Sequence, residues 1–356
     1  MQLKKCSRLL APGMCALLAS TISFAQNSAS FNILNSNAEP DNPGNIYAVD
    51  VNNDGLTDIV EDNGYSPGNY FYVSINKGNG TFAAPVAYTL PAGYSPVCIA
   101  PGDYNNDGKV DLAVPLVSTD EVAVYLGNGD GTFQAPIITT ATLPNGDTFA
   151  DAGCAAADFN GDGKKDLAAW GGGAVYVLEG EGNGSFNATA YSVPATNGQF
   201  PQLFVGDYNG DGRADIATNG PGYGGSTSTV NVFYGNDDFT FNETTPITFT
   251  GYMEIGSGDL NSDGITDLYG IANNYSGTVQ LGAFYGTKSD TFDSYWTDTP
   301  TFNYPQISMG YCPTRFGLKA DTYGDLMVDA GLLSCRSDGA VQAKLRNELR
   351  AGSARS

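Results

Sequence analysis

Apolar positions along this chain come in short runs that are separated by polar turns. In several segments, successive side chains would point alternately to the two faces of a strand, which gives a period of two. Examples are Val122–Leu126, Val175–Leu178 and Val230–Tyr234. This period is typical of β-strands. No long stretch has the spacing of an amphipathic helix. The pattern therefore predicts an all-β fold built from short strands.

An acidic loop of nine residues recurs between these runs, with Asp at positions 1, 5 and 9, Asn at position 3 and Gly at position 6. Its copies are Asp50–Asp58, Asp103–Asp111, Asp158–Asp166, Asp207–Asp215 and Asp259–Asp267. Each copy is followed at once by a short apolar run suited to a buried strand. We therefore expect every acidic loop to join two strands.

The acidic loop has the composition of a cation site. Side-chain oxygens at positions 1, 3, 5 and 9 can converge if the backbone turns tightly at position 6, where Gly permits a positive φ. Hard cations prefer carboxylate, amide and carbonyl oxygens, and Ca²⁺ tolerates irregular geometry better than Mg²⁺ does. The backbone carbonyl of position 7 would be a fifth ligand. The predicted Ca²⁺ ligands are Asp50, Asn52, Asp54, Leu56, Asp58, Asp103, Asn105, Asp107, Lys109, Asp111, Asp158, Asn160, Asp162, Lys164, Asp166, Asp207, Asn209, Asp211, Arg213, Asp215, Asp259, Asn261, Asp263, Ile265 and Asp267.

Two other interpretations compete with a calcium loop between strands. An EF-hand loop begins in the same way but needs a bidentate Glu at position 12. Position 12 is here occupied in turn by Glu61, Val114, Ala169, Thr218 and Gly270. A metal-free turn is the second alternative, since Asp, Asn and Gly all favour turns. The repetition favours a metal, because clustered carboxylates repel one another unless they are neutralised.

A sixth copy of the loop, Asp321–Asp329, departs from the plan. It keeps the three Asp residues but has Tyr323 at position 3 and Leu326 at position 6. A Leu side chain has a steric penalty in the left-handed conformation. We therefore expect calcium at five sites and leave the sixth site open.

A second signature lies between the acidic loops, a turn rich in Gly and Asn that ends in Phe. These residues are Phe82, Phe133, Phe186, Phe241 and Phe292. Each repeat of about 50 residues is then expected to contain four short strands, one on each side of the acidic loop and one on each side of the turn. Four antiparallel strands in each repeat are typical of a β-propeller blade.

Six repeats can be counted, and the sixth lacks its last strand. The segment Ser30–Leu34 precedes the first acidic loop without a repeat of its own. The simplest arrangement makes this segment the missing strand of the last blade, because that removes an exposed sheet edge. The prediction is a six-bladed β-propeller whose last blade is closed by the N-terminal strand, with seven blades as the alternative.

The runs Gly206–Ala217 and Leu126–Phe133 resemble the FG-GAP/VCBS repeats of secreted bacterial proteins, to which the propellers of integrin α-subunits are related. The likeness extends over residues 30–345. It implies a Ca²⁺-loaded propeller whose ligands map onto the Asp and Asn positions given above. Members of this family act in adhesion, sugar binding and polysaccharide cleavage, so the resemblance does not fix the function.

The first residues have the order of a targeting segment. Basic residues are followed by a mostly apolar run, Leu9–Phe24, and by the small residue Ala25. This order predicts a secretory signal peptide at residues 1–25, with a membrane anchor as the alternative. We expect one propeller domain at residues 26–345 and a short basic tail at residues 346–356. The protein would be secreted or extracellular, with the periplasm or the cell surface as other locations.

The net charge limits which binding partners are expected, and the cysteines indicate which disulfide bonds are possible. A formal net charge of −22 disfavours nucleic acid and anionic membranes as partners, and we expect no membrane insertion. Cys312 and Cys335 flank the sixth loop, and export permits a disulfide between them, which we expect. For Cys98 and Cys154 two alternatives stay open, a disulfide or two small buried side chains.

Catalytic chemistry finds little support in the sequence. The chain has no histidine, which excludes Ser-His-Asp and Cys-His mechanisms, and we assign no catalytic residue. We expect a binding or adhesion module for a carbohydrate or a cell-surface protein, as a monomer or as part of a larger surface assembly. The alternative is a polysaccharide-degrading enzyme, a lyase or a hydrolase. Candidate binding loops are Asn63–Asn69, Pro144–Asp151 and Asn219–Ser228.

Overall fold

The computed structural model describes residues 45–62, 69–79, 81–91, 94–193, 202–220, 227–243, 247–250, 252–273, 279–296, 318–320 and 326–328. Its regular structure is β-strand, with short 3₁₀ segments such as η2 (Pro144–Gly146). The predicted all-β fold is confirmed. Across the described part of the chain, no helix has both the length and the apolar character needed to cross a membrane.

The strands form antiparallel sheets in chain order. The first sheet consists of β1 (Ile46–Val49), β2 (Asp58–Asp62), β3 (Tyr70–Ser74) and β4 (Val86–Thr89). The second consists of β5 (Ala100–Gly102), β6 (Asp111–Pro115), β7 (Glu121–Tyr125) and β8 (Ile137–Thr140). The third consists of β9 (Phe149–Ala157), β10 (Asp166–Gly171), β11 (Ala174–Gly180) and β12 (Phe186–Val193).

The remaining sheets continue the same order. The fourth consists of β13 (Gln202–Gly206), β14 (Asp215–Gly220), β15 (Thr227–Gly235), β16 (Phe241–Glu243) and β17 (Ile247–Thr250). The fifth consists of β18 (Tyr252–Gly258), β19 (Asp267–Asn273), β20 (Val279–Thr287) and β21 (Thr291–Trp296). A two-stranded sheet of β22 (Leu318–Ala320) and β23 (Leu326–Val328) follows.

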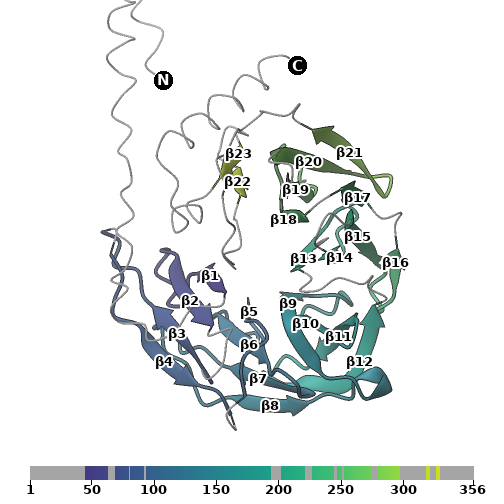
Figure 1. Cartoon of the computed structure of the whole chain (residues 1–356). Helices are drawn as coiled ribbons and strands as arrows, with labels where there is room; N and C mark the ends of the chain where they lie inside the picture. The colour runs from purple at the N-terminus through teal and green to yellow at the C-terminus, as the bar shows by residue number, and fades with distance from the viewer. Residues whose placement is uncertain are drawn as a thin grey trace, which may run out of the picture.

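The sheets lie one after another around an arc, as Figure 1 shows. The first strand of each of the five larger sheets lies toward the centre of the arc, and the last strand lies toward the outside. At the centre, β9 lies against both β5 and β13, and β13 lies against β18. This arrangement of four-stranded antiparallel sheets fits a β-propeller.

The two predicted connections recur in all five sheets. Each acidic loop joins the first strand to the second, and the closing pair in register is the residue before the loop with Asp at position 9, for example Ala157 with Asp166. The Gly/Asn turn joins the third strand to the fourth, and its Phe pairs with a residue at the end of the third strand, for example Phe186 with Gly180. The prediction that the loops link strands is confirmed.

The fourth sheet departs from the expected four strands. Both β16 and β17 pair with the long strand β15, at its two ends, so the outer strand is divided in two. The chain between β16 and β17 contains Pro246, and proline has no N–H to donate to a ladder.

Several predicted features lie outside the described residues. These are the signal peptide, the closing strand Ser30–Leu34, the basic tail and the expected Cys312–Cys335 disulfide. In the sixth repeat, β23 lies at positions 6 to 8 of the predicted loop Asp321–Asp329, and Ala320 pairs with Leu326. In the other five repeats the second strand begins only at position 9. The expected nine-residue loop is therefore wrong for this copy, in which Leu326 replaces the glycine that permits the left-handed turn.

The core lies between neighbouring sheets. In β6 every residue is buried. Leu112 and Val114 belong to the cluster that packs against the first sheet, whereas Ala113 belongs to the cluster shared with the third sheet. A strand covered on both faces is expected to be apolar throughout rather than alternating. This explains why the strands after the acidic loops have continuous apolar sequences.

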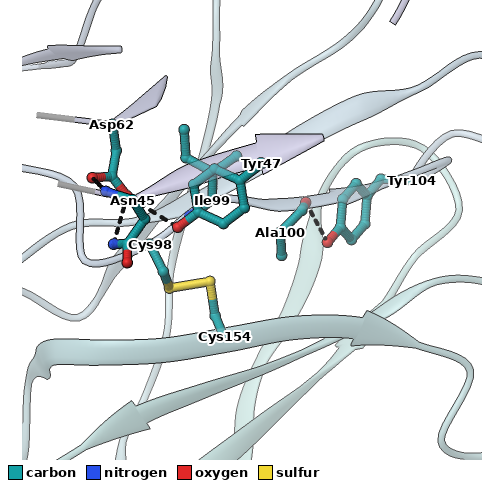
Figure 2. The surroundings of a disulfide bond; sticks show 8 residues. All are labelled: Asn45, Tyr47, Asp62, Cys98, Ile99, Ala100, Tyr104 and Cys154. Carbon is teal, nitrogen blue, oxygen red and sulfur yellow. Dashed lines mark hydrogen bonds between the residues drawn. A yellow bond between two sulfur atoms is a disulfide. The ribbon is translucent and has the colours of Figure 1, made fainter. Parts of the chain in front are cut away.

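A disulfide joins the second and third sheets near the centre of the arc. Cys98, just before β5, is bonded to Cys154 of β9, with their Cα atoms 5.9 Å apart (Figure 2). Both cysteines are buried, at 0% and 5% exposure. The open question about this pair is therefore resolved in favour of a disulfide.

Polar contacts beside the disulfide connect the first sheet to the second. The Tyr47 hydroxyl accepts the backbone N–H of Ile99 at 2.8 Å and donates to the Asp62 carboxylate at 3.0 Å. Asn45 also donates to Asp62, from its backbone N–H at 2.7 Å and its side-chain amide at 2.9 Å. Figure 2 shows this group of side chains next to the Cys98–Cys154 bond.

Loss of the Cys98–Cys154 disulfide should destabilise the protein, because the bond restricts the unfolded chain. We expect the double variant Cys98→Ala/Cys154→Ala to lose about 2–4 kcal/mol of unfolding free energy in urea titrations. A reductant present during the titration should weaken the wild type to a similar extent and leave the double variant unchanged. Equal stability of the oxidised wild type and the variant would contradict this.

Candidate metal-binding loops

The last Asp of each acidic loop is buried and bonded to the backbone on two sides. At position 9, Asp58, Asp111, Asp166, Asp215 and Asp267 are all 0% exposed. In the third loop, Asp166 accepts the N–H of Phe159 at 2.7 Å and the N–H of Gly180 at 2.8 Å. The other four loops have the same two bonds. This carboxylate therefore ties loop position 2 to the end of the third strand.

The residue of the third strand that binds this carboxylate is glycine in four of the five sheets. A Cβ added at Gly127 would lie 2.1 Å from the carbonyl oxygen of Val110, and one at Gly180 would lie 2.0 Å from that of Lys165. Glycine permits this close approach of two backbones. In the first sheet, Asn76 takes this place, and its side-chain amide donates to the carbonyl of Thr57 at 2.9 Å.

Positions 1, 3 and 5 fold the loop around its own backbone N–H groups. In the second loop, Asp103 accepts the N–H of Asp107 at 3.1 Å and that of Gly108 at 2.8 Å. Asn105 also accepts the N–H of Asp107, and Asp107 accepts the N–H of Lys109, both at 3.0 Å. The other loops repeat this set of bonds. The five predicted ligand sets thus share one conformation.

Position 7 makes the loops electrostatically different. Lys109 and Lys164 form ion pairs with the position-5 Asp of their own loops, at 3.0 Å and 2.8 Å. Arg213 pairs with Asp211 at 3.2 Å and with Asp237 at 2.8 Å. The first and fifth loops have Leu56 and Ile265 at this position and so keep all of their negative charge.

Burial of the position-9 carboxylates disfavours their charge. It raises the pKa of Asp166 to about 6 and that of Asp215 to about 7, although two backbone hydrogen bonds act in the opposite direction. The carboxylates at positions 1 and 5 of the same loop raise these pKa values further. The three carboxylates of a loop are therefore close enough to repel one another, and a bound cation would offset that repulsion.

The donor set of each loop fits Ca²⁺ in its chemistry. An ionised carboxylate has about four acceptor positions, and Asp103 and Asp111, for example, each use two of them for backbone N–H groups. Within the described ranges, no three Asp, Glu, Cys or His side chains form a metal site by themselves. Calcium binding would therefore also need the Asn oxygen of position 3 and the carbonyl of position 7, as the sequence predicts.

The predicted binding loops need correction at their edges. Residues 63–68 and 221–226 lie outside the described residues. In Pro144–Asp151, Phe149 is buried and begins β9, while the Asp147 carboxylate accepts a hydrogen bond from the Tyr176 hydroxyl. Asn219 and Ser228 are buried in the fourth sheet. The ends of two predicted loops thus belong to strands, because β9 begins at Phe149, β14 extends to Gly220 and β15 begins at Thr227.

The chain matches the FG-GAP-like repeat family at residues 63–114, 116–169 and 158–218. None of the curated proteins matches it. The matched residues include the second, third and fourth acidic loops and the strands around them.

Solved structures give weaker likenesses. A lectin from Agrocybe aegerita that recognises non-reducing terminal N-acetylglucosamine is 20% identical over 70% of this chain, with a TM-score of 0.47. This chain spans 65% of the lectin's length. A Lactobacillus plantarum protein is 14% identical over 72% of this chain and 70% of its own, also with a TM-score of 0.47. The NanB sialidase from Streptococcus pneumoniae is 12% identical over 73% of this chain and 49% of its own, with a TM-score of 0.36. Scores and identities this low establish neither a shared fold nor a shared activity.

The glycine at the end of the third strand should be required for stability. We expect Gly180→Ala to cost about 3 kcal/mol of unfolding free energy, because its methyl group would strike the Lys165 carbonyl. The matched control is Asn76→Ala, where the backbone already accommodates a Cβ and only two exposed side-chain hydrogen bonds are lost. It should cost less than about 1 kcal/mol. Urea titrations would measure both, and equal losses would argue against the close approach.

Proposed function

From the FG-GAP-like repeats that this chain carries over residues 63–218, we infer that it is a secreted calcium-binding β-propeller. We propose six blades, formed by the five larger sheets and by β22 and β23 together with the N-terminal strand Ser30–Leu34. The propeller would act as a binding or adhesion module for a carbohydrate or a cell-surface protein, without catalysing a reaction.

One observation carries the calcium proposal. All five described loops have the same hydrogen bonds, with a buried carboxylate at position 9 and further carboxylates at positions 1 and 5. An Asn side chain could accept the same backbone hydrogen bonds without carrying a charge, so the geometry of a metal-free turn does not require three carboxylates. Three in each loop raise the cost of the buried charge, and Ca²⁺ would relieve it.

The proposed role of calcium is structural. Each ion would stiffen the connection between the first and second strands of a sheet, and these connections all lie at the same end of the strands. The connections between the second and third strands lie at the other end of the strands, and the candidate loops Asn63–Asn69 and Asn219–Ser228 belong to them. We propose that a ligand binds to the loops between the second and third strands, which are not the proposed calcium loops.

Calcium should raise the thermal stability of the purified protein. A ligand that binds only the folded state stabilises it by about 2.7 kcal/mol for each site when its concentration is 100 times the dissociation constant. We therefore expect EGTA to lower the melting temperature substantially and excess Ca²⁺ to restore it, whereas Mg²⁺ should restore less. An unchanged melt in EGTA, with no calcium found by elemental analysis, would refute the proposal.

A glycan array would test the binding role. We expect retention of the calcium-loaded protein on particular glycans, with no new chain ends after prolonged incubation with the bound glycans. New reducing ends would indicate a hydrolase, and new unsaturated ends would indicate a lyase. Either result would replace the binding module with a polysaccharide-degrading enzyme.

A further inference from the structure

In the second to fifth sheets, the Gly/Asn turn lies against the acidic loop of the sheet before it. The N–H of Gly184, in the turn of the third sheet, donates to the carbonyl of Tyr104 in the second loop at 2.9 Å. A Cβ at Gly131, in the turn of the second sheet, would lie 3.8 Å from the Cβ of Asn52 in the first loop. In these turns, the residue two places before the Phe therefore faces the preceding sheet.

The position two residues before the Phe of the turn carries a carboxylate in the fifth sheet. Gly131 and Gly184 occupy it in the second and third sheets, with φ values of 85° and 87°. Phe239 occupies it in the fourth sheet and stacks on Tyr191 of the third. In the fifth sheet it is Asp290, at a φ of 56°. A left-handed conformation costs free energy for residues other than glycine, so the carboxylate is kept there at some cost.

Asp290 reaches the fourth acidic loop. The side-chain amide of Asn209, at position 3 of that loop, donates to Asp290 at 3.0 Å and to Asp211 at 3.2 Å. Asn209 is 8% exposed, because the turn of the fifth sheet covers it. One amide nitrogen thus lies between two carboxylates from different sheets, an arrangement that would also suit a cation.

A second observation points to an additional ligand at this place. The hydroxyl of Tyr234 is buried, in a side chain that is 4% exposed, and it has no hydrogen-bond partner. A buried hydroxyl without a partner costs free energy. The repeat places this side chain beside Asp290. In the two earlier sheet pairs, the residue before the end of the third strand faces the turn position of the next sheet: a Cβ at Gly131 would lie 2.5 Å from Ile75, and one at Gly184 would lie 2.9 Å from Leu126. Tyr234 holds the same place before Gly235 and therefore faces the turn of the fifth sheet.

We propose that the fourth acidic loop is a cation site shared between two sheets, to which Asp290 of the fifth sheet and the hydroxyl of Tyr234 contribute. This inference rests on the calcium binding proposed above and gives the fourth loop a role that the other loops lack. Arg213 reduces the negative charge of this loop by pairing with Asp211, and Asp290 restores it. An ion at this site would hold the fourth and fifth sheets together.

The test compares calcium binding by variants of the full chain. Asp290→Gly removes the carboxylate and supplies the residue that this backbone conformation favours, so folding should be preserved. Asp290→Asn removes only the charge. Asp130→Asn is the matched control, because Asp130 bonds only to Thr132 within its own exposed turn. Calorimetric titration with CaCl₂ and the calcium-dependent shift in melting temperature are the two readouts.

We expect both Asp290 variants to weaken one calcium site by about tenfold to a hundredfold, with the other sites and the control unchanged. Tyr234→Phe should weaken the same site to a smaller extent. In an Asp211→Asn background, the Asp290 substitutions should have no further effect.

The outcomes separate this inference from the proposed function. If the wild type binds calcium and the Asp290 variants titrate as the wild type does, the shared site is refuted and the calcium-binding propeller stands. If the wild type binds no calcium at all, both fail.

Discussion

A buried carboxylate at the end of each acidic loop is the contact on which the rest of the architecture depends. In every described loop, its two oxygens accept one N–H from the loop itself and one from the end of the third strand. The same Asp also begins the second strand. Three segments of each sheet are thereby fixed relative to one another by a single side chain. Its buried charge is costly, which is why a cation in the loop would add so much to stability.

The fixed loop then supports the neighbouring sheet. In the second to fifth sheets the Gly/Asn turn packs against the preceding acidic loop, and strands such as β6 bury both faces between sheets. Neighbouring sheets are therefore held together by apolar packing along the strands and by polar contacts between the turns and the acidic loops. The Cys98–Cys154 bond adds one covalent link near the centre. Through these contacts, a loop with a fixed conformation also fixes the position of the turn of the next sheet.

The sequence was enough to predict the strands, because acidic loops and Phe-ending turns recur at a fixed place in each repeat. It was not enough to distinguish the buried Asp at position 9 from the partly exposed Asp residues earlier in the loop. Asp162 and Asp166 look alike in the sequence, yet one is partly exposed in the loop and the other is buried under two backbone N–H groups. The recurrence of glycine at Gly127, Gly180 and Gly235 was a signal for this contact that could have been used.

Other features depended on distances that no local pattern contains. Pairing of Cys98 with Cys154 requires two neighbouring sheets to bring their Cα atoms within 5.9 Å, and the sequence left that pairing open. The contact of Asp290 with Asn209 joins residues of different repeats, and repeat-by-repeat analysis does not reveal it.

The most direct test of the central claim is the stability of two Asp→Ala variants in the presence of EGTA. Asp166→Ala leaves two buried N–H groups without partners, each worth about 1–3 kcal/mol, whereas Asp162→Ala removes a carboxylate from the exposed part of the same loop. We expect a much larger loss of unfolding free energy in urea for Asp166→Ala. Equal losses for the two variants would show that the buried carboxylate does not hold the loop and would contradict the account.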